Sequence, residues 1–79
     1  MKYIYILNTC DNWKSYSSMN IEIVTTSWNK LYKKLKEIIL KDELEIGNED
    51  IFDSCKNFPN NYPMLNDVID NIFIERYED

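Results

Sequence analysis

The apolar residues between Trp28 and Ile39 recur every three or four positions, which is the spacing of one face of an α-helix. Lysines and Glu37 occupy most of the other positions. The hydroxyl residues 25–27 precede this stretch, and such side chains accept hydrogen bonds from the free N–H groups of a first helical turn. We therefore predict an amphipathic helix that ends near Leu40 to Glu43 and must pack its apolar face against another layer. That face comprises Trp28, Leu31, Tyr32, Leu35, Ile38 and Ile39.

The segment Tyr3–Leu7 is a short apolar and aromatic run without a polar break. Such a run is typical of a strand that is buried on both faces, so we predict a central strand. Alternation along the strand places Ile4 and Ile6 on one face and the two tyrosines with Leu7 on the other.

Two further segments alternate between apolar and polar residues. Residues 19–25 predict a half-exposed strand with Met19, Ile21 and Ile23 turned inward, and Asn20 and Glu22 turned outward. Residues 72–77 alternate again and predict a closing strand.

The remaining chain predicts two short helices. Asn48 can cap a helix whose first turn carries Glu49 and Asp50, where the helix dipole favours negative charge. A turn rich in proline and asparagine then leads to a second helix, from about Pro63 to Asn71. The first is expected to bury Ile51, Phe52, Cys55 and Phe58, and the second Leu65, Val68 and Ile69.

These elements predict one α+β domain over residues 1–79, in the order ββα(β)ααβ. The sheet is expected to be small and mostly antiparallel, with helices packed on one face. It has three strands, or four if Leu44–Ile46 forms a short strand before Gly47.

The charge of the chain is divided between its two halves. Seven lysines outnumber three acids up to Lys41, whereas eleven acids outnumber two basic residues from Asp42 onward, and the net charge is −5. A solvated helix face explains the lysines, and the negative net charge opposes direct contact with nucleic acid. The acids either keep a small protein soluble or imitate the spaced charges of a phosphate backbone. The acids that would form such a surface are Glu43, Glu45, Glu49, Asp50, Asp53, Asp67 and Asp70.

Catalytic and metal-binding patterns are weak in this sequence. There is no histidine to complete a zinc site or to activate a thiol, and Cys10 and Cys55 form no CxxC motif. The acidic stretch 42–50 fails as a calcium loop because Leu44 and Ile46 occupy ligand positions. A carboxylate-based hydrolase is a third alternative, and it needs one carboxylate in an apolar pocket. We expect no catalysis, no cofactor and no metal.

The connection between the first two strands contains Trp13 and Tyr16 among polar residues. Exposed aromatic side chains in a loop favour a protein contact, because they bring large apolar area at low entropic cost. The alternative is that Trp13 folds back as a lid over the end of the sheet.

The string D-x-W-K-S-Y-S-S-M in this loop, between a short strand and an alternating strand with a helix, resembles small uncharacterised phage and prophage proteins of low-GC bacteria. The resemblance covers Tyr3 to Ile39 and implies a phage or mobile-element origin, but no activity. The abundance of Ile, Asn, Lys and Tyr indicates AT-rich coding.

The expected function is inhibition of a host nucleic-acid-handling defence complex, of the CRISPR kind, through binding of the acids to a basic surface. Anti-CRISPR proteins are similar in type, being small and acidic. The alternative is a homodimeric accessory or regulatory protein that associates through Tyr3, Tyr5 and an uncovered sheet face. No segment reaches the length of a membrane span, so we expect no membrane partner and a cytoplasmic location, in the host cell if the protein is phage-encoded.

Overall fold

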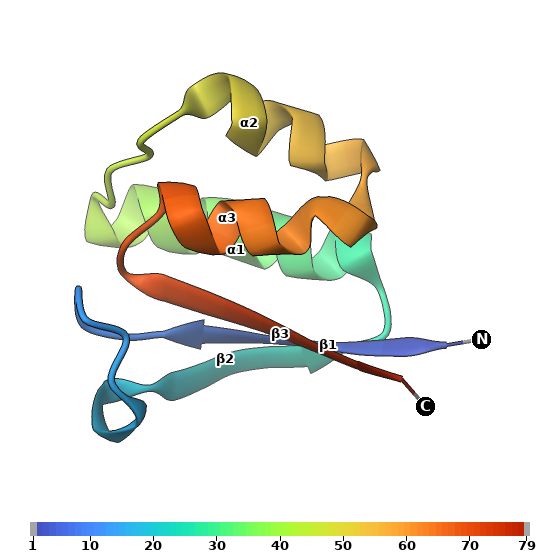
Figure 1. Ribbon diagram of the computed structural model, residues 1–79, viewed down its shortest axis with the longest axis horizontal. Coiled ribbons are helices and arrows are strands. Elements are labelled where there is room, and N and C mark those ends of the chain that lie inside the picture. The colour runs from blue at the N-terminus through green and yellow to red at the C-terminus, as the bar shows by residue number, and fades with distance from the viewer. Residues whose placement is uncertain (1, 79) are drawn as a thin grey trace.

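The computed structural model describes residues 2–78 and contains a three-stranded sheet with helices on one face (Figure 1). The predicted α+β class and the order ββα..ααβ are confirmed. The strands are β1 (Tyr3–Thr9), β2 (Asn20–Thr25) and β3 (Ile72–Glu78). The α-helices are α1 (Trp28–Asp42), α2 (Glu49–Ser54) and α3 (Tyr62–Val68). Three short 3-10 helices are η1 (Tyr16–Ser18), η2 (Cys55–Asn57) and η3 (Pro59–Asn61).

Strand β1 lies at the centre of the sheet, as the sequence predicts, and pairs antiparallel with both neighbours in the order β2-β1-β3. Its pairing with β3 is regular from Tyr3 opposite Glu78 to Thr9 opposite Ile72. Because side chains alternate along paired strands, Tyr5 and Leu7 share one face with Ile74. This is the face that the helices cover, and all three side chains are buried.

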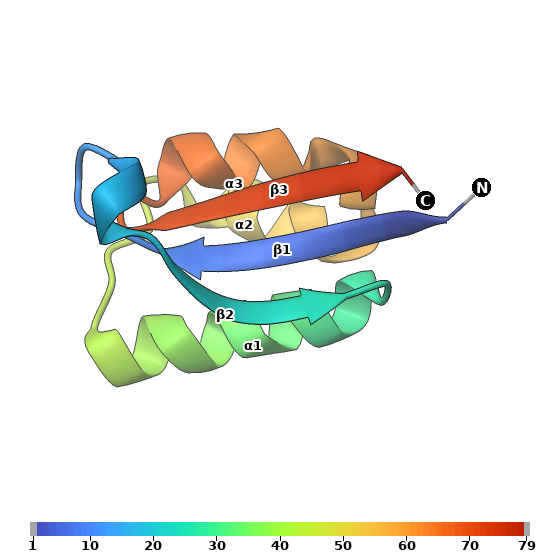
Figure 2. The ribbon, with the colours of Figure 1, turned by 90° about the horizontal axis from the view of Figure 1, so that it is seen from below.

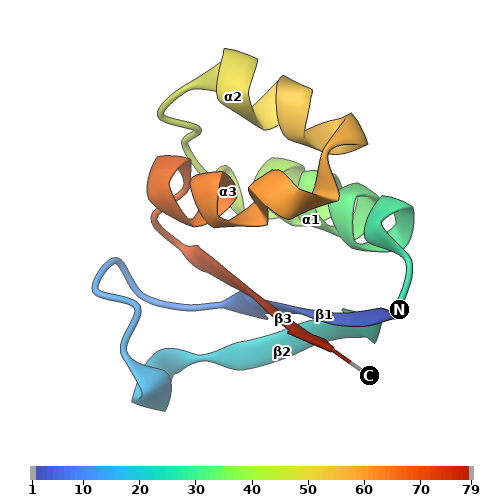
Figure 3. The ribbon, with the colours of Figure 1, turned by 45° about the vertical axis from the view of Figure 1, so that its right-hand side comes forward.

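The helices form a layer on that face. Figures 2 and 3 show α1 running alongside β2 and α3 alongside β3, with α2 farther from the sheet. The predicted stripe of α1 is confirmed as core, since five of its six residues are buried and Ile39 is half-buried. Ser27 caps α1 by accepting a hydrogen bond from the Lys30 N–H. The core residues are Tyr5, Leu7, Trp28, Leu31, Tyr32, Leu35, Ile38, Phe52, Cys55, Leu65, Ile69, Ile72 and Ile74.

Two buried hydrogen bonds fasten α1 to the α2 segment. The indole N–H of Trp28 donates to the Cys55 carbonyl at 2.9 Å, and the Tyr32 hydroxyl donates to the Phe52 carbonyl at 2.6 Å. The Tyr32 and Phe52 rings also stack, with centroids 5.0 Å apart. The apolar stripe of α1 thus supplies both packing area and hydrogen-bond donors to two main-chain carbonyl groups.

The prediction that β1 is covered on both faces is wrong. The helices lie on one side only, so Ile4 and Ile6 are half-buried on a face that no helix covers (Figure 2). The proposed dimer contact through Tyr5 is also wrong, because Tyr5 lies in the core against Trp28, with ring centroids 5.2 Å apart. The sequence of a short apolar run does not show whether one face of the strand or both faces are covered.

The inward position predicted for Ile21 is wrong as well. Leu7 of β1 pairs with Ile23 of β2, but the next residue, Asn8, pairs with Ile21, so the register of the two strands shifts between these pairs. Glu22 is therefore an extra residue, a β-bulge that moves Ile21 to the uncovered face, whereas Ile23 stays with the core.

The optional fourth strand does not form, and Leu44–Ile46 is irregular. Gly47 instead ties this connection to the end of α3, since its N–H donates to the Val68 carbonyl at 2.7 Å. A Cβ at this position would lie 3.2 Å from the same oxygen, so the close approach favours glycine. Helix α2 also ends earlier than the predicted apolar face, at Ser54, and Phe58 is exposed.

Candidate functional site

The uncovered face of the sheet carries several exposed apolar side chains. Pairing places Ile4 opposite Tyr77, and Ile6 opposite both Val24 and Glu75. Ile21, Val24 and Tyr77 are 65, 55 and 53 % exposed. We call this surface the open face; it comprises Ile4, Ile6, Asn8, Ile21, Val24, Phe73, Glu75 and Tyr77. Reasoning from the sequence missed most of it, because its apolar residues were assigned to the interior.

The open face carries one carboxylate, and protein groups already bind both of its oxygens. Asn8 Nδ2 donates to one oxygen of Glu75 at 3.2 Å, and the Tyr77 hydroxyl donates to the other at 3.0 Å. The hydrogen bond to Glu75 raises the pKa of Tyr77. Asn8 is almost fully buried and also donates to the Phe73 carbonyl at 3.1 Å. This network leaves few polar groups of the open face without a hydrogen-bond partner.

Trp13 and Tyr16, the aromatic residues predicted as contacts, are 88 and 85 % exposed. The alternative in which Trp13 folds back as a lid is therefore wrong. Segment η1 lies on the open-face side at one end of the sheet (Figures 1 and 2).

Lys14, rather than Trp13, folds back onto the sheet end. Its ammonium group donates to the carbonyls of Ile69 and Ile72 at 2.9 and 2.6 Å, and burial lowers its pKa. Its backbone adopts the left-handed conformation, with φ 54°. Nothing in the sequence pattern distinguishes this lysine from a solvated one, because its partners are main-chain groups distant in the chain.

Asp11 organises the same loop. Its carboxylate accepts hydrogen bonds from the backbone N–H groups of Trp13 and Ser15 and from the Ser15 hydroxyl. These hydrogen bonds, chiefly those from Ser15, lower the pKa of Asp11. The loop is thereby held in one shape, and the exposed aromatic rings are presented on a fixed backbone.

All seven acids predicted as a binding surface are exposed. Three lie in α2 and one in α3, and the others lie in the connection before α2 or just after α3. Asn48 caps α2 by accepting from the Ile51 N–H at 3.1 Å, as predicted, so Glu49 and Asp50 occupy the first turn. The negative charges of Asp67 and Asp70 raise the pKa of Lys14 against the effect of burial, which places them near the loop.

The structure does not bring every predicted contact residue onto one surface. Helix α2 lies beyond α1 and α3, on the far side of the sheet from η1 (Figure 1). The acids of α2 and Tyr16 therefore belong to opposite sides of the molecule. Lys30, Lys33 and Lys34 of α1 line a shallow depression with Ile23 of β2, whereas Lys36 faces Phe52 of α2, so the charge division of the sequence is only partly a division in space.

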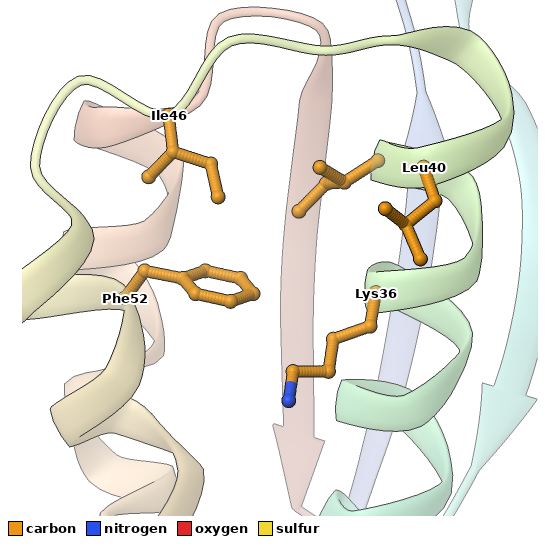
Figure 4. Close-up of a pocket in the computed structure, with 5 residues that line it drawn as sticks. Lys36, Leu40, Ile46 and Phe52 are labelled. Atoms are coloured by element: carbon orange, nitrogen blue, oxygen red, sulfur yellow. The ribbon is translucent and has the colours of Figure 1, made fainter.

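A shallow groove of about 270 Å³ separates α1 from the α2 segment (Figure 4). Ile46 and Phe52 point from one wall toward Leu40 and Lys36 on the other, and Ile39 completes the lining. Its walls are apolar apart from the Lys36 ammonium group, which lies 5.7 Å from the Tyr32 ring centre. A site for a small polar substrate needs several convergent polar groups, and this groove supplies one.

The remaining chemistry-bearing groups are dispersed. Within residues 2–78, no three side chains of His, Cys, Asp or Glu gather as metal ligands. Cys10 and Cys55 are free thiols, and burial raises the pKa of each. No helix in the described part of the chain is long and apolar enough to cross a membrane.

No protein-family model, curated protein or solved structure matches this chain.

Proposed function

We propose that this chain is a non-catalytic inhibitor of phage or mobile-element origin. It binds a host nucleic-acid-handling defence complex, of the CRISPR kind, at a basic surface that otherwise receives nucleic acid. The observation that carries the proposal is the exposure of all seven acids along one continuous segment, from Glu43 through α2 to Asp70.

Electrostatic attraction supplies the binding energy in this proposal. A surface that binds phosphates carries clustered Lys and Arg side chains, and carboxylates presented at similar spacing can displace the nucleic acid. Such an interaction speeds association and selects basic partners. Trp13, which is 88 % exposed in the loop after β1, adds an apolar anchor to this interaction.

Hydrogen bonds fasten the segment that contains α2 to the rest of the fold. Trp28 and Tyr32 hold the main chain of this segment through buried hydrogen bonds, and Asn48 caps its first turn. The backbone that carries the carboxylates is therefore ordered before binding, which lowers the entropic cost of association.

The spatial division of charge also predicts an orientation. A basic partner surface would repel the lysines of α1 and attract α2 and α3. The chain is therefore expected to dock with α2 toward the partner and with β2 and α1 away from it.

The test is a pull-down from host lysate with the tagged wild-type chain and with the variant Glu49→Lys/Asp50→Lys, followed by mass spectrometry. The matched control is Glu22→Lys/Glu37→Lys, which makes the same charge change at exposed residues of β2 and α1. We expect the wild type and the control to retain the same basic partner and the α2 variant to lose it. Equal retention by all three would overturn the proposal.

Salt dependence gives a second readout with the purified partner. If several charges pair across the interface, affinity should fall by a factor of ten or more between about 50 and 200 mM salt. Competition by double-stranded DNA should show the same dependence. Binding that is insensitive to salt would contradict an electrostatic mechanism.

A further inference from the structure

We propose that the open face is the interface of a symmetric homodimer, in which two copies pack sheet against sheet. This inference is independent of the proposed inhibitory function, because it uses the side of the sheet opposite α2 (Figure 3). It also differs from a contact through Tyr3 and Tyr5, since the covered and uncovered faces of β1 carry different residues.

The open face gathers exposed and half-buried apolar side chains from all three strands. An aromatic side chain covers about 150–250 Å², so Tyr77, at 53 % exposure, leaves roughly 80–130 Å² accessible. Ile21 and Val24 are more than half exposed, and Ile4, Ile6 and Phe73 add their accessible parts. Together these side chains give an apolar patch of a few hundred Å², which is the size of the largest and often functional patch on a typical monomer, and a two-fold contact buries it on both copies at once.

The edges of the sheet, in contrast, are closed to strand addition. The side-chain amide of Asn66 in α3 binds the outer edge of β3 through two hydrogen bonds to Ile74. The Ile74 N–H donates to Asn66 Oδ1 at 2.7 Å, and Asn66 Nδ2 donates to the Ile74 carbonyl at 3.0 Å. The bulge at Glu22 interrupts the other edge strand, and bulges of this kind prevent regular pairing. A partner is therefore expected to meet the face rather than an edge.

The charge pattern leaves the open face as the surface on which a second copy can pack. Two chains of net charge −5 repel each other across most of their surface. The open face has a single carboxylate, Glu75, and its oxygens already accept hydrogen bonds from Asn8 and Tyr77. An apolar face whose one carboxylate already has hydrogen-bond donors can pack against its own copy, as a two-fold interface requires.

The experiment measures the mass of the wild-type chain by sedimentation equilibrium across a wide concentration range. The test variant is Ile21→Glu/Val24→Glu, which places two charges at exposed positions of the open face. The matched control is Leu40→Glu, at a residue 81 % exposed on α1, outside this face. Circular dichroism of each variant verifies that it is folded.

We expect the wild type and Leu40→Glu to reach twice the chain mass, and the double variant to dissociate at least 100-fold more readily. A wild type that stays monomeric at every concentration would overturn the inference, as would a double variant that dimerises like the wild type. If the double variant fails to fold, Tyr77→Ser replaces it, since Tyr77 lies at the end of the face and is half exposed. Loss of dimer without loss of partner capture would leave the inhibitory function standing.

Discussion

The two faces of the sheet share three strands but differ in what covers them. On the covered face, Tyr5 and Leu7 meet the aromatic and aliphatic stripe of α1. On the open face, Ile4 and Ile6 have equally apolar side chains but no helix above them. The difference shows that hydrophobicity along β1 does not decide which face becomes core. The number and placement of helices decide it, and the second apolar face of the strand stays uncovered.

The largest effect should separate the two faces directly. Leu7→Ala removes a fully buried side chain and should lower the free energy of unfolding by about 2–5 kcal/mol. Ile6→Ala, on the open face of the same strand, should cost about 1 kcal/mol under conditions where the chain is monomeric, because less apolar area leaves the interior. Urea denaturation of both variants measures the contrast. Equal losses would mean that the open face is buried in the monomer.

Alkaline unfolding sharpens the description of the covered side. Burial, together with the charge of Asp53, raises the pKa of Tyr32 from 10.0 to about 12. Folding therefore favours the protonated phenol, so this contribution is complete below pH 10 and is lost as the pH rises through 12. Between pH 10 and pH 12 the free energy of unfolding of the wild type should fall by about 2–3 kcal/mol relative to that of Tyr32→Phe.

At pH 8 the order of stability of the wild type and Tyr32→Phe should be the reverse of the order at pH 12. Tyr32→Phe should be less stable by about 1 kcal/mol, because the Phe52 carbonyl loses its hydrogen-bond donor. Urea denaturation at a series of pH values tests both statements with one pair of proteins. A constant difference between them from pH 8 to 12 would contradict the burial of this hydroxyl.

The outer edge of β3, where the two faces of the sheet meet, provides a further test. Asn66→Ala removes both hydrogen bonds to Ile74 and should lower the free energy of unfolding by about 1–3 kcal/mol. It should also expose the edge and promote concentration-dependent aggregation, measured by light scattering. Asn60→Ala is the control, since the exposed Asn60 side chain binds Arg76 rather than the strand backbone. Similar aggregation of both variants would refute the protective role.

The smallest effect should come from the outer surface of the helices. Glu49→Lys/Asp50→Lys reverses two charges in the first turn of α2, where the dipole favours acids, and should cost about 1 kcal/mol. Thermal unfolding followed by circular dichroism measures this loss. A much larger loss would show that these carboxylates stabilise the fold, and lost binding by this variant would then have a structural cause.

Local patterns predicted much of the architecture. The stripe from Trp28, the alternation of residues 72–77 and the cap at Asn48 each became the expected element. These signals depend on side chains a few residues apart, which one helix or strand brings together without help from the rest of the chain. The end of α2 was predicted less well, because Phe58 follows two irregular turns that no short-range pattern shows.

Candidate contacts were harder to predict. Exposed aromatic residues in a polar loop identified Trp13 and Tyr16, and both are exposed. Lys14 was missed because its partners, the carbonyls of Ile69 and Ile72, lie more than fifty residues away. Ile21 was placed inside because a bulge appears only once two strands have paired.

The sequence by itself determined the periodic elements, the central strand and the separation of lysines from acids. Tertiary structure alone decided which face of β1 is covered, how Asn66 closes one edge, and that the acids of α2 lie across the sheet from Tyr16 (Figure 1). The physical reason is range. Periodicity and capping act within a few residues, whereas burial of a face depends on elements that arrive from distant parts of the chain.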